Sequence, residues 1–77
     1  MKWSIKEEEI VCKFYLSHQD SWRANIDVVM NELRVAGFAS RDESSARMRI
    51  SNIASLHTGV GLANASKQTV AVYNRLK

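Results

Sequence analysis

The sequence predicts an all-α fold: a compact bundle of three helices with a short fourth element near the C-terminal end. Apolar residues recur at helical spacing in three segments, each segment opens on a residue type that caps helices, and the chain contains no proline. Hydrophobic residues make up 45% of the 77 positions, enough for one small core. We therefore expect a single helical domain over residues 1–77.

The first helix is expected over about residues 5–18. Ser4 and Glu7 stand three positions apart, as the two members of a capping box do. Three glutamates at positions 7–9 place negative charge near the positive end of the helix dipole. The apolar stripe of this helix consists of Ile10, Val11, Phe14 and Tyr15.

The second helix is expected over about residues 22–36, after Asp20 or Ser21 as its N-cap. Gly37 is expected to end it in a left-handed backbone conformation, which glycine adopts without steric cost. The apolar face consists of Trp22, Ile26, Val29, Met30 and Leu33.

The third helix is expected over about residues 41–56, with Ser40 and Glu43 as a second capping box. Its inward face consists of Ala46, Ile50 and Ile53. Its outward face consists of Arg41, Ser44, Ser45, Met48, Ser51, Asn52 and Ser55, with Arg47 and Arg49 at the edges. This face lacks the Glu/Lys pairs that are usual on a solvated helix, and it is the least ordinary surface in the sequence.

Glycines at positions 59 and 61 interrupt the pattern, so His57 to Asn64 is expected to form a loop. Ser66 can then cap a short helix over residues 67–76, with Val70, Tyr73 and Leu76 facing the core. The run from Thr69 to Tyr73 is also rich in β-prone residues, so a strand is the alternative for this element.

Nothing in the sequence indicates catalysis. It contains no G-x-S-x-G motif, and His18 and His57 have no acidic partner at a suggestive spacing. The lone Cys12 excludes an internal disulfide and is expected to be a core residue, so we predict no metal and no cofactor. No apolar run is long enough to span a membrane, and an intracellular, cytoplasmic location is expected.

The distribution of charge indicates a polyanionic partner. Residues 1–38 carry five basic and six acidic side chains, whereas residues 39–77 carry six basic and two acidic ones, a balance of +4. A basic half on a small domain is typical of proteins that bind nucleic acid. Binding of this kind would place the protein on the nucleoid.

The third helix offers residue types suited to double-stranded DNA. Arginine and lysine pair with phosphates, asparagine can recognise adenine, and methionine can contact the thymine methyl. The expected phosphate-binding residues are Arg41, Arg47, Arg49 and Lys67, and the expected base-reading residues are Ser44, Ser45, Met48 and Asn52. Asp42 and Glu43 oppose this interpretation, because they place negative charge at the same end of the helix. The alternative is a protein–protein adaptor that uses the same face, its arginines lying across the edges of the core.

Two resemblances agree with DNA binding. The opening Trp3-Ser4-Ile5-Lys6-Glu7-Glu8-Glu9, with Trp22 nineteen residues after the first tryptophan, resembles the W-(T/S)-x-x-E-(E/D) start of a Myb/SANT repeat. It implies a three-helix unit of the helix-turn-helix type. The third helix of such a repeat reads DNA, which corresponds here to the helix that starts near Arg41.

The second resemblance covers more of the chain. Residues 41–53, RDESSARMRISNI, and then residues 61–67, GLANASK, are similar to a helical N-terminal module found ahead of HNH endonuclease domains in bacterial restriction-like proteins. It implies a DNA-binding accessory module of a nuclease or regulator, excised from a longer protein, with a fused or associated nuclease as partner. The His-Asn-His residues of the nuclease itself are not among these positions. The DNA sequence read, the strandedness of the target and the oligomeric state do not follow from the sequence.

Overall fold

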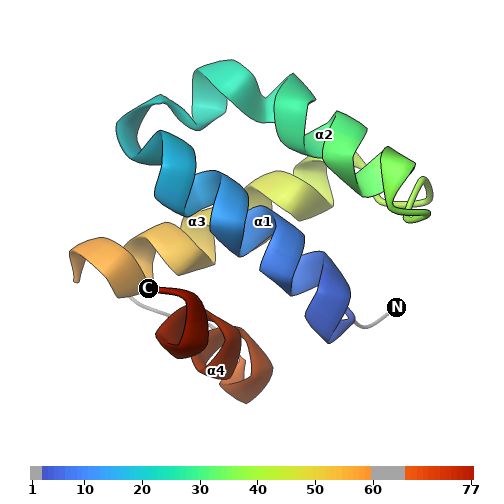
Figure 1. Ribbon diagram of the computed structural model, residues 1–77. Helices are drawn as coiled ribbons and strands as arrows, with labels where there is room; N and C mark the ends of the chain where they lie inside the picture. The colour runs from blue at the N-terminus through green and yellow to red at the C-terminus, as the bar shows by residue number, and fades with distance from the viewer. Residues whose placement is uncertain (1–2, 60–65) are drawn as a thin grey trace.

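The computed structural model describes residues 3–59 and 66–77, and these form four α-helices (Figure 1). The helices are α1 (Ile5–His18), α2 (Ile26–Val35), α3 (Glu43–Thr58) and α4 (Lys67–Leu76). Two 3₁₀ turns, η1 (Gln19–Ser21) and η2 (Arg23–Asn25), connect α1 to α2. The prediction of an all-α fold is confirmed, and the fourth element is a helix, so its alternative as a strand is wrong.

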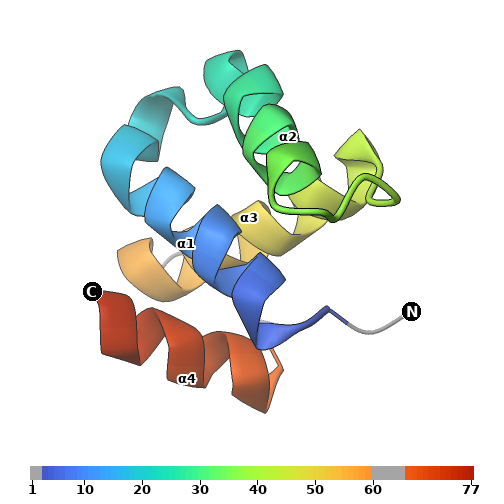
Figure 2. The ribbon, with the colours of Figure 1, turned by 45° about the vertical axis from the view of Figure 1, so that its right-hand side comes forward.

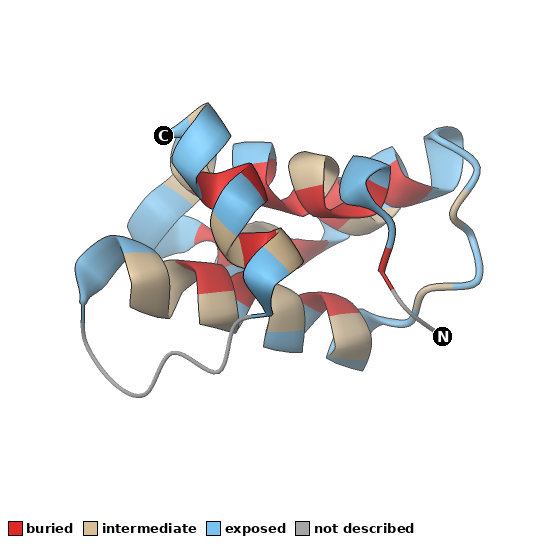
Figure 3. Cartoon of the chain, turned by 90° about the horizontal axis from the view of Figure 1, so that it is seen from below, coloured by how far each residue is buried: buried red, intermediate tan, exposed pale blue. Residues whose placement is uncertain are grey.

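Helix α1 is the central element of the bundle. It packs against α2, α3 and α4, whereas α2 and α4 lie on opposite sides of it (Figures 1 and 2). The radius of gyration is 11.3 Å, close to the value of about 11.5 Å expected for a compact domain of this length. Each helix turns its buried side inward (Figure 3). The buried apolar side chains are Trp3, Val11, Cys12, Phe14, Tyr15, Trp22, Ile26, Val29, Leu33, Ala46, Ile50, Ile53, Val72 and Tyr73.

Helix boundaries marked by polar caps were predicted best. α1 covers the predicted residues, and its capping box is present: the Glu7 amide donates to the Ser4 hydroxyl, and the Ser4 amide donates to the Glu7 carboxylate. Ser66 caps α4 by accepting from the Thr69 amide, as predicted. Gly37 has a φ of 97°, which confirms the left-handed turn after α2.

The start of the second helix was predicted wrongly. The α-helix begins at Ile26, four residues after the predicted start, and the preceding residues form η1 and η2. Trp22 is nevertheless buried as expected, because the 3₁₀ turns carry its indole into the core. Neither Asp20 nor Ser21 caps α2; its N-cap residue is Asn25, whose side chain makes no capping bond.

The third helix is shifted relative to its prediction. Asp42, not Ser40, is the N-cap, and its carboxylate accepts from the Ser45 amide at 2.8 Å. At the other end the helix continues through His57 and Thr58, which were expected in a loop, and Gly59 ends it with a φ of 71°. The remainder of that predicted loop, residues 60–64, lies outside the described residues.

The inward side of α4 was predicted in part: Tyr73 is buried as expected, and Leu76 packs at the edge of the core. Thr69, Val72 and Tyr73 are buried, whereas Val70 and Leu76 are only half-buried. A threonine takes the central position because a buried carboxylate of α1 accepts its hydroxyl hydrogen. None of the helices within residues 3–59 and 66–77 combines the length and the apolar character needed to cross a membrane.

Candidate nucleic-acid interface

The outward side of α3 borders a shallow hollow that it shares with the turn before α2. Ala46, Ile50 and Ile53 occupy the buried side of the helix, so residues offset from them in the helical repeat face solvent. The hollow is lined by Trp22, Arg23, Ser44, Arg47, Met48, Ser51 and Asn52. Four of the eight predicted site residues therefore lie together, and no carboxylate is among the lining residues.

Two observations describe the chemical character of this hollow. Met48 is 69% exposed, although it is one of the larger apolar side chains of the domain. The Arg23 guanidinium lies over the Trp22 ring, 4.5 Å from its centroid, an arrangement that holds the charge at the rim. Arg23 was not among the site residues predicted from the sequence. Its place directly after Trp22, a tryptophan predicted to lie in the core, was the available signal that it stands at the edge of the core.

Arg47 forms an ion pair within its own helix. Its Nε lies 2.9 Å from a carboxylate oxygen of Glu43, one turn earlier, and both side chains are about half exposed, at 47% and 54%. Exposed pairs of this spacing contribute only about 0.3–0.5 kcal/mol. The guanidinium therefore stays available to a stronger anionic partner.

Arg41 forms a buried ion pair with Glu7 of α1. Its guanidinium pairs with the Glu7 carboxylate through two hydrogen bonds and lies 4.6 Å from the centroid of the Trp3 ring. The two paired side chains are only 9% and 6% exposed. Hydrogen bonding from Arg41, aided by Ser4, lowers the pKa of Glu7 to about 2. Arg41 thus connects the loop before α3 to the start of α1.

Arg49 also belongs to a buried polar cluster. Its Nη1 lies 2.9 Å from the Thr69 hydroxyl and 3.4 Å from the Glu8 carboxylate, and the guanidinium faces the Trp3 ring. Glu8 is only 1% exposed, and it accepts further hydrogen bonds from Thr69 and Gln68. The cluster joins α1, α3 and α4.

The burial of Glu8 has a signal in the sequence, namely its register with the apolar stripe of α1. Glu8 stands three, four and seven positions before Val11, Cys12 and Tyr15, all buried. A residue in register with an apolar helix stripe is expected to face the core. The sequence analysis treated the three glutamates only as charges in the first helical turn. It therefore did not predict that Glu8 is buried and forms hydrogen bonds inside the bundle.

The glutamates at positions 7, 8 and 9 each pair with a different arginine. Glu7 pairs with Arg41, Glu8 with Arg49, and Glu9 with Arg75 of α4. With the pair made by Arg47, four of the six basic residues in the second half of the chain face a carboxylate. The charge of +4 assigned to that half is therefore offset largely by α1.

The last two predicted site residues lie apart from the hollow on α3. Lys67 is exposed at the first turn of α4, where it lines a separate hollow with Trp3 and Arg49. Ser45 is half-buried in α3, and its amide is held by the Asp42 cap.

The histidines and the cysteine do not approach one another as a group. The ring Nδ1 of His18 lies 2.9 Å from the Phe14 carbonyl oxygen, and that of His57 lies 2.9 Å from the Tyr73 hydroxyl. Cys12 is buried in α1, and burial, together with the charge of Glu8, raises the pKa of its thiol to about 11. Cys12 therefore belongs to the core, whereas His18 stacks on Phe14 at its edge and His57 is exposed beside Tyr73.

Comparison of the chain with protein-family models, with curated proteins and with solved structures finds no significant match. The described residues form an all-helical domain with an exposed hollow on α3. Among these residues no carboxylate lines the hollow, although Arg47, which does line it, pairs with the carboxylate of Glu43.

Proposed function

We propose that this domain binds duplex DNA through the outward side of α3. The observation that supports this most is the composition of the hollow: two arginines, two serines and an asparagine line it, and no carboxylate does. Phosphates are drawn to arginine and repelled by carboxylates, so among the hollows of the described residues this composition fits a polyanion best.

The residues divide into two roles in this proposal. Arg23 and Arg47 bind phosphates at two sides of the hollow, one from the turn before α2 and the other from α3. Asn52 reads adenine, Met48 contacts a thymine methyl, and Ser44 and Ser51 allow the helix close to the base edges. A helix of 16 residues is about 24 Å long, sufficient to lie in the major groove.

The pair between Glu43 and Arg47 is compatible with this role. It is exposed and contributes little, so a phosphate can replace the carboxylate with little loss of stability. Arg41 and Arg49 are left out of the proposed interface because each already pairs with a buried glutamate.

The finer architecture and biological setting belong to the same proposal. We assign α1, α2 and α3 to a helix-turn-helix unit of the Myb/SANT kind, with α3 as the reading helix and α4 packed on α1 as an addition. Residues 41–53 also resemble the module that precedes HNH nuclease domains, which favours an accessory role beside a nuclease or regulator. The remainder of that resemblance, residues 61–65, lies outside the described residues.

The test is fluorescence anisotropy of a labelled random 20-base-pair duplex at low salt. Replacing Arg23 and Arg47 together with alanine is expected to weaken binding more than tenfold. The matched control combines Lys13→Ala with Arg34→Ala, which removes two exposed positive charges outside the hollow and is expected to change affinity much less. Equal affinities for the wild type and the double variant would refute the proposal.

Protein docking through the same face is the second candidate, and the exposure of Met48 supports it. A methionine 69% exposed beside two serines suits close contact with a partner helix. Binding of a protein partner with an affinity independent of salt concentration, and its loss in Met48→Ser, would favour this candidate over DNA binding.

A further inference from the structure

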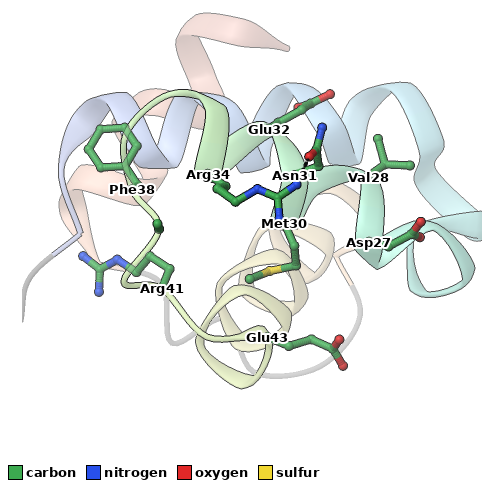
Figure 4. A pocket seen from close by; sticks show the side chains of 10 residues that line it. Asp27, Val28, Met30, Asn31, Glu32, Arg34, Phe38, Arg41 and Glu43 are labelled. Atoms are coloured by element: carbon green, nitrogen blue, oxygen red, sulfur yellow. Dashed lines mark hydrogen bonds between the residues drawn. The ribbon is translucent and has the colours of Figure 1, made fainter.

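A second and larger hollow lies on another face of the molecule, along α2 and the segment that leads into α3. Its volume is about 790 Å³, and it shares no lining residue with the hollow on α3. Figure 4 shows Asp27 and Phe38 at opposite ends of it, with Met30 and Arg34 between them.

The groove has an apolar component that no element of the described chain covers. Val28 is 37% exposed, and Met30 and Phe38 are half-buried at the edge of the core. Val35 stands seven positions after Val28 on the same side of α2 and is 78% exposed. Together with the side chains that line the groove, these two valines give α2 an apolar stripe that the described residues leave open to solvent.

The rim of the groove is acidic. Asp27 and Glu32 are exposed lining residues, and within residues 3–59 and 66–77 neither makes an ion pair. Glu43 lies at the bottom of the groove in the view of Figure 4, and its carboxylate pairs with Arg47.

The arginines of the groove do not reverse this charge. Arg41 is neutralised by Glu7. Arg34 also lines the groove, where its guanidinium donates a hydrogen bond to the Asn31 side chain. One positive charge therefore stands beside the two negative charges of Asp27 and Glu32. The groove therefore carries net negative charge, the opposite of the hollow on α3.

We propose that this groove is the docking site of a basic amphipathic helix from a partner protein. A large apolar side chain of the partner would pack against Val28, Met30 and Phe38, and its lysines or arginines would face Asp27 and Glu32. Helices are commonly recognised in this way, by an apolar groove with a charged rim. Nucleic acid is disfavoured here because the rim would repel phosphates.

The experiment is an NMR titration of the labelled, complete chain with a designed helical peptide of leucine and lysine. The control peptide carries glutamate in place of every lysine. We expect shift changes to concentrate on residues 27–35 and 38–43 with the lysine peptide, and to be absent with the glutamate peptide. Asp27→Asn combined with Glu32→Gln is expected to weaken binding by about threefold to tenfold, as loss of two exposed ion pairs does.

Two further variants separate charge from packing. Val28→Ser alters an exposed position, so it is expected to weaken binding of the lysine peptide without unfolding the domain. Asp20→Asn removes an acidic charge from η1, outside the groove, and is expected to have no effect. Unchanged affinity in the double variant, equal binding of both peptides, or shifts centred on another face would each overturn the proposal. Concentration-dependent shifts on α2 without peptide would also overturn it, because they would assign the groove to a second copy of the chain.

Discussion

Arg41 Nη2 donates a hydrogen bond to Glu7 Oε1 at 3.0 Å, and this contact joins the loop before α3 to the first turn of α1 across 34 positions of sequence. Glu7 also accepts the Ser4 amide in the capping box. The Glu7 carboxylate thus takes part in the N-terminal cap of α1 and also binds Arg41 in the loop before α3. The pair is buried, so removing one member leaves an uncompensated charge.

We predict that Arg41→Ala destabilises the fold by about 3 kcal/mol, the lower end of the range for a broken buried ion pair. Arg47→Ala removes an arginine whose carboxylate partner is exposed, and it should cost only about 0.5 kcal/mol. Urea denaturation of the two variants measures both values. Equal losses would mean that the Arg41 pair is no more buried in solution than the Arg47 pair.

The pH dependence of stability should reveal Glu7. Its pKa falls from the ordinary 4.5 to about 2 in the folded protein, so the unfolded chain binds this proton more readily. The stabilisation from Glu7 is therefore complete above about pH 4.5 and is lost as pH falls toward 2. Denaturation at pH 5, 4 and 3 should show a smaller decline for Glu7→Gln than for the wild type, and parallel declines would contradict this assignment.

Sequence patterns predicted the helices well where local chemistry sets them. The Ser4 and Ser66 caps and Gly37 act on backbone groups within a few residues, so their effects could be inferred from neighbouring positions alone. The start of α2 was predicted wrongly because residues 23–25 form a 3₁₀ turn instead. The helical spacing of Trp22 and Ile26 is compatible with either conformation, since both side chains are buried in the structure.

The same distinction explains the candidate site. Ser44, Met48 and Asn52 share a face because helical periodicity requires it, and the sequence predicted their grouping. The positions of Arg41 and Arg49 could not be predicted in this way. They depend on contacts with Glu7 and Glu8, which are 34 and 41 positions away in sequence. Net charge counted along the chain does not show which charges already face one another.

Thr69 is expected to secure α4 to the rest of the bundle. Its hydroxyl donates to Glu8 and lies 2.9 Å from Arg49 Nη1, so Thr69→Val leaves buried polar groups with fewer partners. We predict a loss of about 1–3 kcal/mol and faster amide hydrogen exchange in α4 than in α3. Ser51→Ala is the control, because it removes a hydroxyl from an exposed side chain of α3. A similar loss in both variants would argue against a special role for Thr69.

Cys12 should be unreactive while the protein is folded. Its side chain is 1% exposed, and burial raises the pKa of the thiol to about 11, so little thiolate exists near neutral pH. Reaction with a chromogenic disulfide at pH 8 is expected to be slow in buffer and fast in urea. A Ser17→Cys variant on a Cys12→Ser background places the thiol at an exposed position and should react at once. Rapid modification of the folded wild type would contradict the burial of Cys12.

The salt dependence of binding to duplex DNA distinguishes the interface proposed above, with Arg23 and Arg47, from the four-residue interface predicted from the sequence. Each phosphate neutralised contributes about −0.9 to the slope of log K against log salt. Two contacts, from Arg23 and Arg47, give a slope of about −2, whereas the four basic residues of the sequence prediction would give about −4. Anisotropy titrations of a random duplex over a range of salt concentrations measure this slope. A slope near −4 in the wild type that becomes shallower in Arg49→Gln would show that Arg49 contacts a phosphate. In that case DNA would replace Glu8 as the partner of the Arg49 guanidinium.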